Sequence, residues 1–173
     1  LSTARLISAY SNGIFPWFED EGHYYWYSPD PRFVLFPNDL KVHKSMRSVF
    51  NQNKFEYTLD TNFEQVIRAC SELPRNGQKG SWISESFVEG YTELHRQGVA
   101  HSMEVWQEGR LVGGLYGLSL GRVFFGESMF AQETNASKAG CMTLVHALKS
   151  AGFWLVDCQQ ETPHLKSLGG LHT

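Results

Sequence analysis

The order of the elements predicted between residues 101 and 159 constrains the fold more than any other feature of the chain. Three strand-like segments follow one another, at 101–106, 110–118 and 122–130. Glu108-Gly109 is typical of a tight hairpin turn between the first two. A helix is predicted over about 135–150, and an apolar strand begins at Phe153. The pattern predicts an α/β fold of the α+β type, with an antiparallel meander, a covering helix and a further strand.

The last predicted strand, Phe153-Trp154-Leu155-Val156-Asp157-Cys158-Gln159, is apolar until it ends in a carboxylate and an amide. Side chains two residues apart on a strand share a face, so Asp157 and Gln159 are expected to point the same way. Ligands of open α/β sheets usually bind at such strand ends. A buried Asp157 could hold the NH2 group of Gln159 and direct its carbonyl oxygen at a substrate. The alternative is an Asp that caps a following turn.

Glu127 is the one acid in the segment 123–130, which is otherwise suited to burial. An unpaired buried charge is costly, so this carboxylate needs a partner or a purpose. A structural ion pair, a site for a cationic substrate and a general base all remain open.

The first half of the chain predicts a small N-terminal subdomain, or its remnant, over 1–32 and a main domain over 33–173. Ser2 and Gly13 bracket a helix, and the segment that follows is rich in proline and aromatic residues, which excludes regular helix. Further on, Thr61-x-x-Glu64 predicts a capping box, and Ser84 is expected to cap the next helix.

Composition supports one globular domain, because 173 residues with 42% hydrophobic content can bury a real core. The net charge of −3 gives no overall tendency to bind nucleic acid. The best candidates for local phosphate contacts are basic residues on a short predicted helix and just beyond it, namely Lys41, His43, Lys44, Arg47 and Lys54. The alternative, which the sequence favours, is an ordinary solvated helix face.

Cysteine and histidine usage argues against a metal site. Cys70, Cys141 and Cys158 are scattered without paired spacing, and the seven histidines show no ligand-like spacing. These features predict a reducing compartment and no metal. No apolar run approaches the ~20 residues of a membrane span, so a cytoplasmic location is expected. Gly113-Gly114-x-x-Gly117 is similar to a phosphate loop, but no helix follows it, and a strand bulge or close packing within a strand is the better explanation.

Five motifs occur in a specific order along the chain: Gly13-Ile14-Phe15-Pro16-Trp17-Phe18, Trp26-Tyr27-Ser28-Pro29-Asp30-Pro31-Arg32, Gly126-Glu127-Ser128-Met129-Phe130, Asn135-Ala136-Ser137-Lys138 and Asp157-Cys158-Gln159. Together they resemble the bacterial leucyl/phenylalanyl-tRNA–protein transferases, from Leu1 to about Gly170. Because this family continues beyond both ends, the resemblance implies a chain truncated at both ends. The element order is also similar to that of the acetyltransferase-like (GNAT-type) fold, a mixed sheet flanked by helices that splays near its last strands.

The resemblance implies transfer of Leu, Phe or Met from aminoacyl-tRNA to the α-amino group of proteins that begin with Arg or Lys, which marks them for degradation. Asp157 and Gln159 are then the catalytic pair, and Glu127 binds substrate. No cofactor is needed, because converting an ester into an amide is downhill. The tRNA is expected to be held chiefly through its 3′ end and acceptor stem.

The resemblance also implies an apolar pocket for the transferred side chain, at Leu115, Phe124 and Met129. Leu115 stands where the family commonly has Met, which is a volume-conserving change. Trp17, Trp82 and Tyr91 match aromatic positions near the aminoacyl-adenosine, although each could instead belong to the core. Thr162 replaces an expected Asn, so a hydrogen bond assigned to that position is in doubt.

Two other functions are compatible with this fold. A CoA-dependent acyltransferase would place a glycine-rich turn at about 131–137, but this segment has no glycine and contains an acid. A peptide- or RNA-binding module could keep the fold without catalysis. The presence of Asp157, Gln159 and Glu127 argues against that second alternative.

Overall fold

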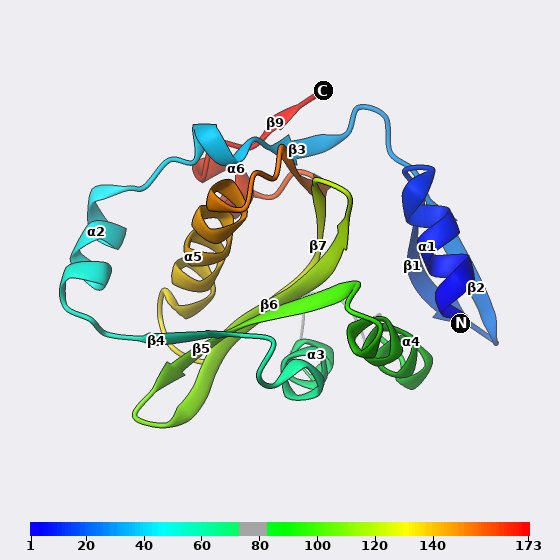
Figure 1. Cartoon of the computed structure of the whole chain (residues 1–173), viewed down its shortest axis with the longest axis horizontal. Coiled ribbons are helices and arrows are strands. Elements are labelled where there is room, and N and C mark those ends of the chain that lie inside the picture. The colour runs from blue at the N-terminus through cyan, green and yellow to red at the C-terminus, as the bar shows by residue number, and fades with distance from the viewer. Residues whose placement is uncertain (73–82) are drawn as a thin grey trace.

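The computed structural model describes residues 1–72 and 83–173, and its centre is a seven-stranded sheet in the order β4-β5-β6-β7-β8-β3-β9 (Figure 1). The strands are β3 (Phe33–Leu35), β4 (Glu56–Leu59), β5 (Ala100–Gln107), β6 (Arg110–Leu120), β7 (Val123–Ala131), β8 (Leu155–Gln159) and β9 (Leu171–His172). Neighbouring strands are antiparallel except β7 and β8, which are parallel. The predicted mixed sheet flanked by helices is therefore confirmed, as is the order of meander, helix and strand.

The turn between β5 and β6 shows why local sequence predicted this part well. Glu108 and Gly109 both have positive φ, at 51° and 72°. Two successive residues of this kind form the tight turn whose twist matches that of paired strands.

Helices cover both faces of the sheet. They are α1 (Thr3–Ser11), α2 (Lys44–Asn51), α3 (Phe63–Glu72), α4 (Glu85–Arg96), α5 (Ala136–Ser150) and α6 (Pro163–Ser167), with a short 3₁₀ helix, η1 (Pro37–Asp39). On one face α5 packs against β5, β6 and β7, and α2 and η1 pack against α5. On the other, α3 packs against the same strands beside α4. Each face has its own buried apolar cluster.

The N-terminal elements form a separate layer beside α4. The strands β1 (Phe15–Asp20) and β2 (His23–Tyr27) make their own two-stranded sheet, and α1 packs against α4 and β1 (Figure 1). Leu6 and Tyr10 of α1 share a buried cluster with Phe87 and Tyr91 of α4. The boundary between a 1–32 subdomain and a 33–173 domain stays a prediction.

Two of the three predicted helix caps differ from expectation. Ser2 does cap α1, since its hydroxyl accepts from the Arg5 N–H. The capping box at Thr61 and Glu64 is wrong: α3 begins at Phe63, the Thr61 hydroxyl donates to Glu104, and Glu64 pairs with Arg68. Ser84 occupies the cap position of α4, but its hydroxyl donates to Glu19. In both cases the hydroxyl is oriented toward a carboxylate that is distant in the sequence.

Candidate functional site

The sheet opens between β7 and β8. Their parallel pairing runs from Val123 and Leu155 to Phe125 and Asp157. Beyond that point Gln159 pairs with Phe33 of β3, while β7 continues along β6. Glu127 and Gln159 each lie two residues beyond the last β7–β8 pair, so they flank the opening.

A β-bulge lies on each side of this opening. In the β6–β7 register Tyr116 pairs with Ser128 and Gly117 with Gly126, which leaves Glu127 as the extra residue. In the β3–β8 register Phe33 pairs with Gln159 and Val34 with Asp157, which leaves Cys158 as the extra residue. Bulges redirect side chains and are frequent beside active sites.

The second bulge corrects one prediction from the sequence. Asp157 and Gln159 pair with consecutive residues of β3, whose side chains alternate between the two faces. Gln159, which has a φ of 64°, lines a cavity, whereas Asp157 is 5% exposed and turns to other partners. The expectation that both side chains share one face is therefore wrong, because it assumed an unbroken strand.

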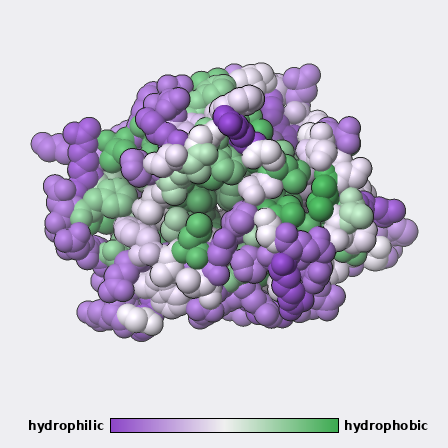
Figure 2. Space-filling model, viewed as in Figure 1, coloured by the Kyte–Doolittle hydropathy of each residue, from purple (hydrophilic) through white to green (hydrophobic). Residues whose placement is uncertain are grey.

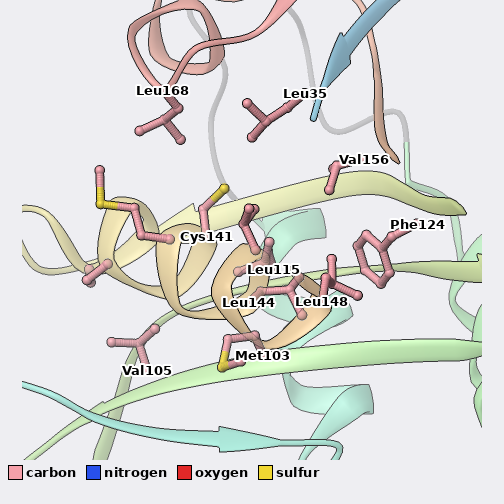
Figure 3. Packing of buried hydrophobic residues seen from close by; sticks show 14 of the residues in the cluster. Leu35, Met103, Val105, Leu115, Phe124, Cys141, Leu144, Leu148, Val156 and Leu168 are labelled. Carbon is pink, nitrogen blue, oxygen red and sulfur yellow. The ribbon is translucent and has the colours of Figure 1, made fainter. Parts of the chain in front are cut away.

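The cavity has a volume of about 1020 Å³ and an apolar floor. Its lining includes the predicted pocket residues Leu115, Phe124 and Met129, together with Leu144, Leu148 and Val156. Figure 3 shows α5 residues Leu144 and Leu148 beside Leu115 and Phe124 of the sheet. Leu115 and Met129 are direct cross-strand partners. In Figure 2, which has the same view as Figure 1, apolar residues gather across the middle of the visible face and hydrophilic residues surround them.

One wall of the cavity is polar and is organised by Glu127. Gln159 Nε2 donates to Glu127 Oε1 at 2.8 Å. The Tyr91 hydroxyl donates to Glu127 Oε2 at 3.1 Å and is itself paired with the Tyr10 hydroxyl at 2.5 Å. Glu127, and not Asp157, therefore holds the NH2 group of Gln159. With that group engaged, the Gln159 carbonyl oxygen is the acceptor that the side chain can offer to a substrate.

Burial raises the pKa of Glu127 to about 7, against the lowering effect of hydrogen bonds from Tyr10, Tyr91 and Gln159. The nearby charge of Asp157 adds to the increase. A carboxyl group with this pKa changes its protonation state near neutral pH, which suits a group that binds or moves protons.

Asp157 forms an ion pair with Arg32, whose role no local pattern in the sequence indicates. Arg32 Nε and Nη2 donate to the carboxylate at 2.9 and 2.8 Å, and the Gln159 N–H donates to it at 2.9 Å. Arg32 Nη1 also donates to the Gly13 carbonyl, and its guanidinium lies 4.9 Å from the Phe15 ring centroid. The pair thus anchors the backbone of Gln159 to the N-terminal layer. The available signal was that a buried Asp requires a cation.

The three predicted aromatic contacts have different surroundings. Trp17 lines the cavity. Tyr91 is 0% exposed, so its geometry favours a hydrogen-bonding role over base stacking. Trp82 lies outside the described residues.

Three other residues stand at the edge of the cavity. Thr162 lines it and caps α6, since its Oγ1 accepts from the Leu165 N–H at 3.2 Å. Lys138 and His164 also line it, although their sequence context does not mark them as site residues. Burial and the charge of Lys138 lower the pKa of His164.

Among residues 1–72 and 83–173, no cluster of three or more His, Cys, Asp or Glu side chains is arranged to bind a metal ion. Over the same part of the chain, no helix has the length and apolarity that a membrane crossing requires.

Comparison with known proteins agrees with these features. The family model for leucyl/phenylalanyl-tRNA protein transferase matches residues 34–173, and the model for the N-terminal domain of the same family matches residues 1–30. The leucyl/phenylalanyl-tRNA–protein transferase of Pseudomonas fluorescens is 54% identical over 98% of this chain and 74% of its own length. The enzyme of Oleidesulfovibrio alaskensis is 51% identical over 98% of this chain and 70% of its own length.

Among solved structures, L-PGS from Bacillus licheniformis matches with a TM-score of 0.54 at 13% identity, over 92% of this chain and 52% of that protein. This likeness concerns the fold alone. The sequence matches decide the family, because they cover nearly the whole chain at about half identity. The chain belongs to the leucyl/phenylalanyl-tRNA–protein transferase family, whose members are aminoacyltransferases.

Proposed function

We propose that this chain transfers Leu, Phe or Met from aminoacyl-tRNA to the α-amino group of proteins that begin with Arg or Lys, as a mark for degradation. One observation carries the proposal: an apolar cavity ends at a carboxamide, Gln159, that is fixed by Glu127 at the opening of the sheet. The apolar floor suits the side chain that is transferred. The polar wall suits the two reacting groups.

The reaction needs few components. The neutral amine nitrogen attacks the ester carbonyl, a C–N bond forms, the ester C–O bond breaks, and a proton passes from the amine to the departing ribose oxygen. Because an amide is more stable than an ester, neither ATP nor CoA is required. The enzyme has to orient the two groups and help the proton to leave.

Gln159 and Asp157 form the catalytic pair of this proposal, with distinct roles. The Gln159 carbonyl oxygen accepts a hydrogen from the attacking amine, and it can aim this oxygen because Glu127 holds its NH2 group. Asp157 fixes the backbone of Gln159 and is kept in place by Arg32. An amide is a weak base, so positioning contributes more than proton abstraction. Glu127, when ionised, can also hold an ammonium group of either substrate.

The donor is recognised at both of its ends. Leu115, Phe124 and Met129 receive the apolar side chain, and Trp17 offers a stacking face to the terminal adenine. Lys44 and Arg47 line a second groove, on α2, where phosphates of the acceptor stem would find cationic partners.

The test combines the protein with radiolabelled leucyl-tRNA and two peptides that differ only in beginning with Arg or Ala. Label in a hydrolysis-resistant amide on the Arg peptide alone is the expected result. Equal labelling of both peptides would contradict the acceptor rule. A protein that also contains the family's flanking segments serves as the comparison, and failure of that longer protein would favour a binding module over an enzyme. A titration with CoA is expected to show no binding.

A further inference from the structure

The hairpin β1–β2 exposes a set of aromatic side chains beside the cavity. Phe18, Tyr25 and Tyr27 are 39%, 48% and 44% exposed, which is unusual for side chains of this size. Together with Trp17 they form what we call the aromatic strip. The Phe18 and Tyr25 rings stack with centroids 4.5 Å apart, and the Trp17 and Tyr27 rings meet edge to face at 4.6 Å.

The register of the hairpin places Phe18 and Tyr25 on the face that points away from the protein, whereas Trp17 lies at a break in the register and is partly buried against the α4 cluster. Phe18 pairs with Tyr25. On the other face, Tyr24 and Trp26 pack against the cluster that contains α4, and Glu19 accepts from the hydroxyls at the start of that helix. The hairpin is therefore held chiefly by one face, while Phe18, Tyr25 and Tyr27 stay exposed on the other.

The strip is continuous with the proposed donor site, because Trp17 belongs to the strip and also lines the cavity. Tyr27 and Tyr25 follow outward along β2, about 7 Å apart by the rise of a strand. The strip ends at the turn, where Asp20 and Glu21 are exposed and would repel phosphates. It thus offers two stacking positions outside the cavity, at Tyr27 and at the Phe18–Tyr25 pair.

We propose that the aromatic strip binds, by stacking, the two unpaired nucleotides that precede the terminal adenosine of the donor. This inference rests on the proposed function. Single-stranded RNA is the occupant that fits, since exposed aromatic rings stack on bases regardless of sequence. If the terminal adenosine binds at Trp17, the preceding nucleotides must leave the cavity next to that residue.

The experiment compares two donors, leucyl-tRNA and 2′(3′)-O-leucyl-adenosine, on the protein in which Phe18 and Tyr25, whose rings stack on each other, are both replaced by Ala. Tyr27 is left in place because its ring contacts Trp17. With leucyl-tRNA, kcat/KM is expected to fall about tenfold, because the stacking position at this pair is lost. With leucyl-adenosine, which lacks the preceding nucleotides, kcat/KM is expected to stay within about twofold, and this also shows that the variant is folded.

Two control variants sharpen the result. Tyr25→Phe keeps the stacked ring and is expected to retain activity with either donor. Trp154→Ala removes a 68% exposed ring that lies over Arg122, away from the strip, and is expected to change neither donor. An equal loss with both donors, no loss with leucyl-tRNA, or a raised KM for the acceptor peptide alone would each overturn the proposal. A wild-type protein that uses neither donor would instead contradict the proposed function.

Discussion

Two acids on the central strands, Glu104 of β5 and Glu127 of β7, have opposite surroundings. Glu104 is 0% exposed, and the fold supplies partners for both of its oxygens. Oε2 accepts from the hydroxyls of Thr58 and Thr61 at 2.6 and 2.9 Å. Oε1 accepts from the Ser102 hydroxyl at 2.5 Å and from the Asn62 N–H at 3.3 Å. This carboxylate ties β4 and β5 to the start of α3.

Glu127 instead faces the cavity with fewer partners. It accepts from Tyr10, Tyr91 and Gln159, and the last of these also lines the cavity. Burial raises the pKa of Glu127 to about 7, so its ionised form is less stable in the folded protein than in water. The comparison teaches that a buried acid with every partner inside the fold is structural, while one that shares a partner with a cavity is available for chemistry.

The largest expected effect comes from removing the partner that Glu127 shares with the cavity. Gln159→Ala deletes the only proposed acceptor for the attacking amine, so kcat for transfer should fall by ~10²–10⁴-fold. Binding of leucyl-tRNA should change little, because Gln159 contacts the reacting groups and not the bulk of the donor. Single-turnover transfer and a filter-binding titration measure the two quantities. Gln132→Ala, an exposed residue after β7, is the matched control. Retained turnover in Gln159→Ala would remove Gln159 from the mechanism.

The next largest effect tests whether Glu104 contributes to stability and Glu127 does not. Glu104→Gln leaves backbone N–H groups and hydroxyls facing an amide NH2, so the free energy of unfolding should fall by ~2–3 kcal/mol. Glu127→Gln replaces a carboxyl group that burial disfavours in its charged form, and at pH 8 its free energy of unfolding should stay the same or rise. Urea unfolding monitored by tryptophan fluorescence measures both. Equal destabilisation by the two substitutions would erase the distinction between the acids.

The features that could be predicted from the sequence are those set by neighbouring residues. Features set by contacts between residues far apart in the chain could not be predicted. The β5–β6 hairpin, the meander and α5 follow from local patterns, such as Glu108-Gly109, and were predicted correctly. The bulges at Glu127 and Cys158 depend on the register between strands, which no local pattern reveals. Arg32 and Asp157 meet across 125 residues. Glu104 and Glu127 are both single acids in strands that are otherwise largely apolar. Only their hydrogen-bond partners in the folded protein show that one is structural and the other faces the cavity.

The pH dependence of transfer tests whether the ionised form of Glu127 is needed for activity. If ionised Glu127 is needed to hold Gln159, kcat/KM should rise as pH increases through about 7, the pKa of Glu127. A second rise follows near pH ~8 as the acceptor α-amine loses its proton. In Glu127→Gln, kcat/KM should be roughly tenfold lower, and only the second rise should remain. Measurements from pH 5.5 to 9 with one Arg peptide test this, and a persisting first rise would assign that ionisation to another group.

The smallest effect concerns Asp60, which is paired within the fold, as Glu104 is, but is also partly exposed. It is 30% exposed, and its Oδ2 lies 2.8 Å from His101 Nδ1. The hydrogen bond to Asp60 raises the pKa of His101 although burial opposes it. Burial acts to raise the pKa of Asp60, but hydrogen bonds from His101 and the Ser102 N–H bring it below its usual value. The pair therefore stabilises the fold between the ordinary pKa of Asp and the raised pKa of His101, and its contribution is lost as pH rises through that raised value.

His101→Gln should accordingly lower the free energy of unfolding by ~0.5–1 kcal/mol at pH 5.5, a small value because solvent screens the pair. At pH 9 the loss should be smaller, since His101 is then neutral in the wild-type protein as well. Urea unfolding at both pH values, with exposed His146→Gln as the control, measures the difference. An equal loss at both pH values would mean that His101 acts through packing and its hydrogen bond to Ser119, and not through its charge.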